Sequence, residues 1–395
     1  MTPQKARLTP QAGFNLLALL VIVCWLALLP SLHRFPPDIQ IYYRAAQRLA
    51  HGEALYPLHS GYIYPPLLAQ ALALVPLPRA GVLVLWSVLL AASALITVWL
   101  GLRAARLRVP EVSINTQLLS ALGFGLLLSE PVFRGLLLGN ASPLVAGLLA
   151  LAANSFWTFP LASGVLLGLA TSIKIVPGVL LAWMVGAYMR QRERRFLVGA
   201  AAGMITLALS LVHPDTLGYL DAAHDEVQSR LGLGNNLSVF AELERMSGLR
   251  VPGVLGPLFG AAAAFALGLR MPAGPAAAQS GWGIAQLIAL LSAPVAWSHL
   301  YVLALWPALI AAGNLARDSA QTTAPKRWQL EALIMLMVFC ILMRVRFFYS
   351  PDDVWGSVVF PLIPLIGLGL IARRLFHDWR QPVPQPSAAL GSSAI

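Results

Sequence analysis

The sequence contains few charged residues, and this shortage restricts the class of protein. Only 11% of its 395 residues are charged, whereas 58% are hydrophobic. A typical soluble domain is roughly a quarter charged. Because so few polar side chains cannot cover a water-exposed surface, we expect most of the surface to face lipid. The composition therefore excludes a cytosolic enzyme and a disordered chain.

Cysteine is also scarce, with only Cys24 and Cys340, each inside an apolar run. This excludes a disulfide-rich secreted scaffold, and neither residue has the spacing of a metal ligand. Asp352 and Asp353 are adjacent, a pattern more typical of a solvated loop than of a metal site. The sequence predicts neither a metal nor another cofactor.

Acidic residues are outnumbered, with 16 Asp and Glu against 27 Lys and Arg, a net charge of +11. The basic residues form short clusters between apolar runs, which is how membrane proteins set their orientation, so they do not indicate a nucleic-acid partner. The strongest cluster is Arg190–Arg195. With it inside the cell, the loops 213–250, 296–299 and 344–353 are expected outside, and both chain ends inside.

The apolar runs predict an all-α polytopic transmembrane helical bundle. A spanning helix needs about 20 apolar residues, and two cytoplasmic ends need an even number of crossings. The short run that opens with Tyr64-Pro65-Pro66 is expected not to cross, which gives about 12 crossings. Residues 1–380 are expected to form one membrane-embedded domain, and 381–395 a disordered cytoplasmic tail. The thirteen runs are 14–32, 64–78, 81–102, 116–130, 140–156, 160–173, 175–189, 196–212, 251–270, 282–296, 298–313, 329–346 and 354–371.

Acidic residues are rare deep inside these runs, where an ion pathway would need them. The sequence contains no repeat of fixed period, so it does not support an inverted-repeat transporter. Most acids lie at the ends of the runs or in the outer loops. Asp221, Asp225 and Glu226 have helical spacing, with His224 between them, and predict a solvated amphipathic helix in an outer loop. The acids therefore favour chemistry at the outer interface over an ion-coupled pump.

The first outer loop predicts a short amphipathic helix between Asp38 and Gly52. Apolar residues recur there at helical spacing, as in helices that lie along a bilayer surface. Asp38 is placed to cap this helix, which would stabilise it by roughly 1 kcal/mol. The pattern alone favours this capping role over a functional one, but the two are compatible, since a capping carboxylate held by the backbone is also well positioned for chemistry. The string Tyr62-Ile63-Tyr64-Pro65-Pro66 follows, where two prolines fix the angle at which the chain re-enters the membrane.

Asp38 is followed by Tyr42-Tyr43, Ala45-Ala46, a glycine, Tyr56-Pro57 and Tyr64-Pro65-Pro66-Leu67. The later strings are Leu138-Gly139-Asn140, the segment Gly164–Pro177 with Lys174 three residues before its proline, Gly234-Asn235-Asn236-Leu237-Ser238, and Ser292–His299. Taken in this order, the strings resemble those of glycosyltransferase family 87. The last string departs from the family pattern, because Leu300 replaces a second histidine.

The resemblance implies a GT-C-type membrane enzyme that uses a polyprenyl-phosphate-linked sugar, typically mannose. It implies an inverting transfer on the outer face, with Asp38 as the catalytic base. One carboxylate suffices for this chemistry, because a lipid phosphate leaves as a stable anion. A glycoside hydrolase needs two carboxyl groups.

The resemblance and the loop positions also nominate substrate-binding residues. Cations at the membrane boundary would bind the donor phosphate. Each of these cations also has a purely structural interpretation, for example as a lysine that snorkels to the membrane surface or as a neighbour of the aromatic belt. The candidates for the donor phosphate are Lys174, His299, Arg344 and Arg346. The candidates for other substrate contacts are Tyr42, Tyr43, Tyr62, Tyr64, Asn140, Asn236 and Trp297.

The sequence therefore predicts a transferase in the bacterial cell membrane, with its active site on the extracytoplasmic side. Its partners would be a polyprenyl-phosphate sugar, a lipid or glycan acceptor, and membrane lipids. A flippase for a lipid-linked saccharide would have the same hydropathy and remains the alternative. A non-catalytic membrane assembly subunit is a third possibility.

Overall fold

The computed structural model describes residues 36–57, 60–108, 113–230, 236–248, 252–320 and 360–380. Every regular element in these ranges is a helix, as the apolar runs predict. The runs predicted at 14–32 and 329–346, the residues Arg344 and Arg346, and the tail 381–395 lie outside the described residues.

Most of the predicted runs form helices with ends close to the expected ones. Proline at or next to the first position starts α7, α8 and α14, because a proline there loses no helical hydrogen bond. The helices are α2 (Pro37–Ala50), α3 (Leu67–Ala73), α4 (Arg79–Arg106), α5 (Ser113–Leu127), α6 (Glu130–Leu138), α7 (Ser142–Ser155), α8 (Pro160–Ile173), η2 (Val176–Gly178), α9 (Val179–Gln191), α10 (Arg194–Ser210), α11 (Thr216–Arg230), α12 (Val239–Ser247), α13 (Leu255–Gly268), α14 (Pro275–Leu291), η3 (Ser298–Ala304), α15 (Leu305–Ala320) and α18 (Phe360–Arg380).

Three helical stretches among the described residues are long and apolar enough to cross a membrane: Arg79–Arg106, Leu119–Leu138 and Ser298–Asp318. Shorter apolar helices are α7, α8 and α13. The count of about 12 crossings therefore stays a prediction. Helix α3 has seven residues, a length of about 10 Å, so it is too short to cross a bilayer by itself.

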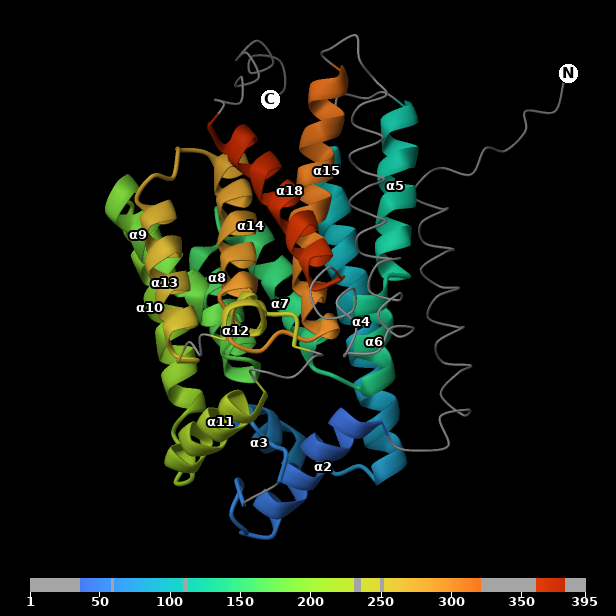
Figure 1. Ribbon diagram of the computed structural model, residues 1–395, viewed down its shortest axis with the longest axis vertical. Coiled ribbons are helices and arrows are strands. Elements are labelled where there is room, and N and C mark those ends of the chain that lie inside the picture. Colours follow the sequence, from blue (N-terminus) through green and yellow to red (C-terminus); the bar gives the residue numbers. More distant parts are fainter. Residues whose placement is uncertain are drawn as a thin grey trace, which may run out of the picture.

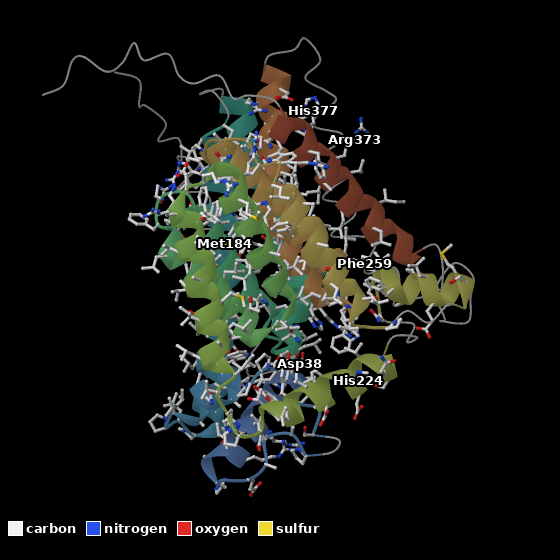
Figure 2. All side chains as sticks on the ribbon, turned by 90° about the vertical axis from the view of Figure 1, so that its left-hand side faces the viewer. Asp38, Met184, His224, Phe259, Arg373 and His377 are labelled. Carbon is white, nitrogen blue, oxygen red and sulfur yellow. The ribbon has the colours of Figure 1, made fainter. Side chains whose placement is uncertain are left out.

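The long helices form a bundle, and α2, α3 and α11 lie together at one end of it (Figure 1). Within the bundle, α8 packs against α7 and α10, while α4 packs against α7 and α15. Figure 2 places Asp38 towards this end and Arg373 towards the opposite end. At that opposite end, Arg108 donates hydrogen bonds to Asn314 (2.9 Å) and Gln279 (2.8 Å). Arg374, next to Arg373, bonds to the carbonyl of Asn314, so Arg108 and Arg374 lie together at the end away from Asp38.

Helix α2 is the amphipathic helix that the first outer loop predicts, and its residues Ile39, Tyr42, Ala45 and Ala46 are buried. The prediction that Asp38 caps it is wrong. Pro37 fits the first helical position, so the helix starts two residues earlier than a cap at Asp38 would require. Pro36 is the cap residue, and no side chain caps the helix. Asp38 lies in the first turn, where a carboxylate still interacts favourably with the helix dipole.

Helix α11 is the predicted loop helix. Asp221, His224 and Asp225 are exposed on it, while Tyr219 is buried. Burial raises the pKa of Tyr219 to about 12, so this phenol stays protonated. One face of α11 therefore packs on the protein, and the acidic face is solvated.

Glycines allow α8 and α10 to approach until their backbones touch. A Cβ atom on Gly164 would overlap the carbonyl oxygen of Gly199, and one on Gly168 would lie 2.6 Å from the carbonyl oxygen of Gly203. Small residues at helix contacts are a usual basis of packing in membranes, where burial of apolar surface gives little gain. The contact between α8 and α10 matters for the site because α8 ends at Lys174.

We expect Gly164→Ala to destabilise the protein by about 1–3 kcal/mol, because the methyl group forces two packed helices apart. The measurement is the thermal midpoint of the detergent-solubilised protein, followed by size-exclusion chromatography after heating. Gly369→Ala is the matched control, since a Cβ atom there meets nothing within 4 Å. Equal midpoints for the two variants would contradict the tight helix contact.

Candidate active site

Asp38 is joined to the bundle through Asn140, a residue 102 positions away in the sequence. The amide Nδ2 of Asn140 donates a hydrogen bond of 2.6 Å to Oδ2 of Asp38. Gly139, which precedes it, has a φ of +64°, and a Cβ atom there would lie 3.0 Å from the side chain of Ile39. The left-handed glycine therefore lets the turn between α6 and α7 approach α2 closely.

The hydrogen bonds continue from Asn140 to a lysine. Oδ1 of Asn140 accepts from the backbone N–H of Ser142 (2.9 Å) and from its hydroxyl (2.7 Å). Nζ of Lys174 donates to Oγ of Ser142 at 2.8 Å. A continuous chain of three side-chain hydrogen bonds thus connects the carboxylate of Asp38 with the ammonium of Lys174.

Lys174 lies just after the last residue of α8, where the backbone becomes extended (φ −141°, ψ 127°). Its ammonium also lies over the ring of Tyr64, 5.7 Å from the centroid, a cation–π distance. Burial lowers the pKa of Lys174 to about 8, although the charge of Asp38 acts in the opposite direction. The side chain is therefore cationic at neutral pH and loses its charge in mildly alkaline solution.

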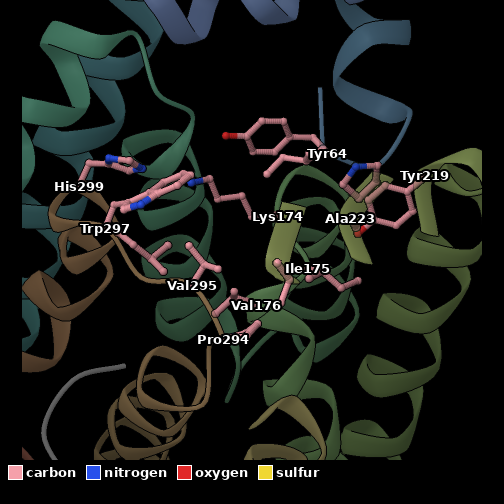
Figure 3. Close-up of a pocket in the computed structure, with 14 residues that line it drawn as sticks. Tyr64, Lys174, Ile175, Val176, Tyr219, Ala223, Pro294, Val295, Trp297 and His299 are labelled. Carbon is pink, nitrogen blue, oxygen red and sulfur yellow. The ribbon is translucent and has the colours of Figure 1, made fainter. Parts of the chain in front are cut away.

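A cavity of about 140 Å³ lies beside Lys174. Figure 3 shows Lys174, Trp297 and His299 on one side of it, and Tyr219 and Ala223 on the opposite side. Most of the other lining residues are apolar; they include Ile63, Ile175, Val176, Val227, Pro294, Val295 and Leu300. The pocket therefore combines an apolar wall with one cationic corner. Asp38 is not among its lining residues and reaches it through the hydrogen-bonded chain.

His299 belongs to η3 and is buried, and Nε2 has no hydrogen-bond partner among the described residues. Lys174 and Arg134 both lie close enough to interact with it electrostatically. Its neighbour Ser298 donates a hydrogen bond of 3.0 Å to the buried carboxylate of Glu130. One turn of α6, from Glu130 to Arg134, thus adds two charged residues next to His299.

The four predicted tyrosines have different surroundings. Tyr42 packs edge-on against Tyr64 (5.0 Å between centroids) and Trp86 (5.6 Å), and its hydroxyl accepts from the backbone N–H of Ala141. Tyr62 is fully buried, and its hydroxyl donates to the carbonyl of Pro65. Tyr43 is only half-buried. Of the four, Tyr64 is the one that lines the pocket.

Asn236 is fully buried and fastens one loop to another. Its Nδ2 donates to the carbonyl of Pro294 (3.1 Å), and its Oδ1 accepts from the backbone N–H of Ala296 (2.9 Å) and from that of Ser238 (3.1 Å). These bonds hold the segment that leads to Trp297. They favour a positioning role for Asn236 over the substrate contact that the sequence suggests.

The structure brings most of the predicted residues to one end of the bundle. Asp38 bonds directly to Asn140, and Asn140 is linked to Lys174 through Ser142. Tyr64, Trp297 and His299 line the pocket with Lys174, and Tyr42 packs against Tyr64. Ser142, Trp86 and Arg134 belong to the same cluster of contacts but are not among the residues predicted from the sequence. Arg134 and Glu130 interrupt an apolar stretch, and charged residues in such a stretch are a recognisable signal of function. Ser142 and Trp86 carry no such signal.

Within the described ranges, no group of three His, Cys, Asp or Glu side chains is placed to hold a metal ion. The polar groups around the pocket are one ammonium, one imidazole, an indole and two phenols. Such a set can bind an anion through Lys174 and pack an apolar chain against the remaining wall. The nearby carboxylate of Asp38 can accept a proton.

Comparison with known proteins identifies the family. The model of glycosyltransferase family 87 matches residues 62–291, which is more than half of the chain. A search of curated proteins found no match. The matched segment contains Asn140 and Lys174, whereas Asp38 and His299 lie on either side of it. The chain, which has several apolar helices typical of a membrane protein, belongs to glycosyltransferase family 87.

Proposed function

We propose that the protein transfers a sugar from a polyprenyl phosphate to a lipid or glycan acceptor in the outer leaflet of a bacterial cell membrane. Mannose is the proposed sugar, since it is typical of the enzymes that the sequence resembles. The observation that carries the proposal is the linkage of a carboxylate and an ammonium, Asp38 and Lys174, through two hydrogen-bonded side chains beside a mostly apolar pocket.

The pocket has the chemistry that a lipid phosphate requires. Apolar residues can contact the first part of the isoprenoid chain, and Lys174 can neutralise the phosphate. His299 and Trp297 line the same side and can donate N–H groups to phosphate oxygens. Fixed donors and cations are worth most where water is excluded, because there the charge that develops in the transition state is poorly screened.

In the proposed reaction, Asp38 removes the proton from an acceptor hydroxyl while that oxygen attacks the anomeric carbon. The new glycosidic bond forms on the face opposite the phosphate, and the bond between the anomeric carbon and the phosphate oxygen breaks. Its electron pair stays with the phosphate, so the configuration inverts. The departing phosphate gains negative charge next to Lys174 and needs no general acid. The half-buried carboxyl of Asp38 can then release its proton to water.

The proposed orientation places this site on the extracytoplasmic side. Arg373 lies at the end of the bundle opposite Asp38 (Figure 2). Its neighbour Arg374 bonds to Asp318 and to the carbonyl of Asn314, and the side chain of Asn314 accepts from Arg108. Basic segments prefer the cytoplasm. Membership of a glycosyltransferase family supports a transferase over the alternative, a flippase of a lipid-linked saccharide.

We expect Asp38→Asn to lower the transfer rate at least about 100-fold, because the amide cannot accept the hydroxyl proton. The assay uses purified protein in liposomes with radiolabelled polyprenyl-phosphate mannose and a lipid extract as acceptor, and it measures labelled lipid product. Asp221→Asn is the matched control, since it removes an exposed carboxylate of α11 at the same end of the bundle.

Turnover of Asp38→Asn near that of Asp221→Asn would refute the role of Asp38 as base. Transbilayer movement of the labelled donor without product formation by the unaltered protein would support the flippase instead.

The donor KM should depend on pH through Lys174. Because its pKa is lowered to about 8, the ammonium that binds phosphate is present below pH 8 and is lost as the pH rises above it. An ordinary lysine would keep its charge to about pH 10. We expect the donor KM to rise between pH 7 and pH 9.5 by about tenfold for each pH unit above 8.

Lys174→Arg should abolish this rise, because arginine stays charged, and Lys174→Gln should show a high KM that does not change with pH. Steady-state kinetics with the same labelled donor measures both. An identical alkaline dependence in the protein and in Lys174→Gln would show that another group titrates.

A further inference from the structure

Two polar residues stand between the carboxylate and the ammonium of the site. Asn140 and Ser142 are both fully buried at the start of α7. The three hydrogen bonds measure 2.6 Å from Asn140 to Asp38, 2.7 Å from Ser142 to Asn140 and 2.8 Å from Lys174 to Ser142. The last two lie in the normal range for good hydrogen bonds, and the first, to a carboxylate, is slightly shorter than is usual for N–H···O.

The direction of this chain is fixed by the chemistry of its ends. An ammonium has donors only, and an ionised carboxylate has acceptors only. The hydroxyl of Ser142 therefore accepts from Lys174 and donates to Asn140, and the amide of Asn140 donates to Asp38. The backbone N–H of Ser142 also donates to Oδ1 of Asn140, so the amide cannot flip without losing two bonds.

The geometry points to Asn140 and Ser142 as positioning residues that hold the base and the donor-phosphate cation in one hydrogen-bonded unit. This inference rests on the proposed function, in which Asp38 accepts a proton and Lys174 binds phosphate. Asn140 orients the carboxylate towards the acceptor hydroxyl, which governs kcat. Ser142 supports the charged form of Lys174, which governs the donor KM.

The other groups that face Asp38 and Lys174 are unchanged when Ser142 is substituted. Tyr42 and Lys174 lie near Asp38. Tyr64 and His299 lie near Lys174, and Arg134 lies near His299. Because these groups are unchanged in variants of Ser142, a change in the titration of Lys174 there reports the loss of its hydrogen bond.

The first test measures this titration without any sugar transfer. The sequence has three lysines, Lys5, Lys174 and Lys326, so acetylation of Lys174 with trace acetic anhydride can be followed by mass spectrometry from pH 6 to pH 11. Ser142→Ala should lower the midpoint of Lys174 by about one pH unit, because a hydrogen bond to the charged form is lost. Ser142→Thr, which keeps the hydroxyl, should restore it.

The second test is kinetic and uses the liposome assay with labelled polyprenyl-phosphate mannose. Ser142→Ala should raise the donor KM about tenfold at pH 7.5 with a smaller effect on kcat, and Ser142→Thr should recover it. Asn140→Ala should lower kcat about tenfold or more and leave the donor KM within a few-fold. The fold loss of kcat/KM in the double variant should be smaller than the product of the fold losses in the two single variants, since the residues act as one unit.

Ser155→Ala and Asn154→Ala are matched controls, because both residues lie in the last turn of the same helix α7, far from the site. Both should behave like the unaltered protein in each test. Equal acetylation midpoints in Ser142→Ala and Ser155→Ala, or a kcat of Asn140→Ala equal to that of Asn154→Ala, would overturn the inference.

Failure of the proposed function would give a different result. The unaltered protein would then form no labelled product, while the acetylation midpoint of Lys174 would still depend on Ser142. That outcome would retain the linked unit and reject the polyprenyl-phosphate donor.

Discussion

The hydrogen bond between Asn140 and Asp38 is the contact on which the site depends, because it joins a helix at the end of the bundle to the bundle itself. A carboxylate moved out of water is costly unless it is hydrogen-bonded or paired with a cation. Here the amide supplies the hydrogen bond, and Lys174 supplies the compensating charge through Ser142. The same contacts that make the burial of Asp38 acceptable also set where a proton acceptor and an anion-binding group lie.

Aromatic packing makes this arrangement rigid. Tyr42, one turn after Asp38 on α2, is buried between Tyr64 and Trp86. The indole of Trp86 donates a hydrogen bond of 2.8 Å to the carbonyl of Gly139, immediately before Asn140. Helix α2, the start of α4 and the turn before α7 are thereby fixed to each other. A carboxylate held in this way loses little freedom when another molecule binds, which suits the proposed role of Asp38 as a base in a reaction that depends on orientation.

The sequence predicts the helices well, because long apolar runs bounded by proline, glycine and basic residues leave few alternatives in lipid. It also identifies Asp38 and Lys174 as candidates, through their place beside apolar runs and through motif resemblance. It fails at Ser142 and Arg134, since their importance comes from contacts between distant parts of the chain. Even the capping role expected for Asp38 is wrong, because Pro37 starts the helix first and Asn140 binds the carboxylate.

The position of the family match explains why the structure is needed to assemble the site. The matched segment, 62–291, carries the cation and the linking residues, whereas Asp38 precedes it and His299 follows it. Asp38 and His299 are both distant from Lys174 in sequence. Asp38 is nevertheless linked to Lys174 through two side chains, and His299 lines the same pocket as Lys174. Asp38, the proposed base, lies half-buried on α2, and Lys174 lies beside a mostly apolar pocket. This separation suits the proposed reaction, in which one substrate is a polar hydroxyl and the other is a lipid phosphate.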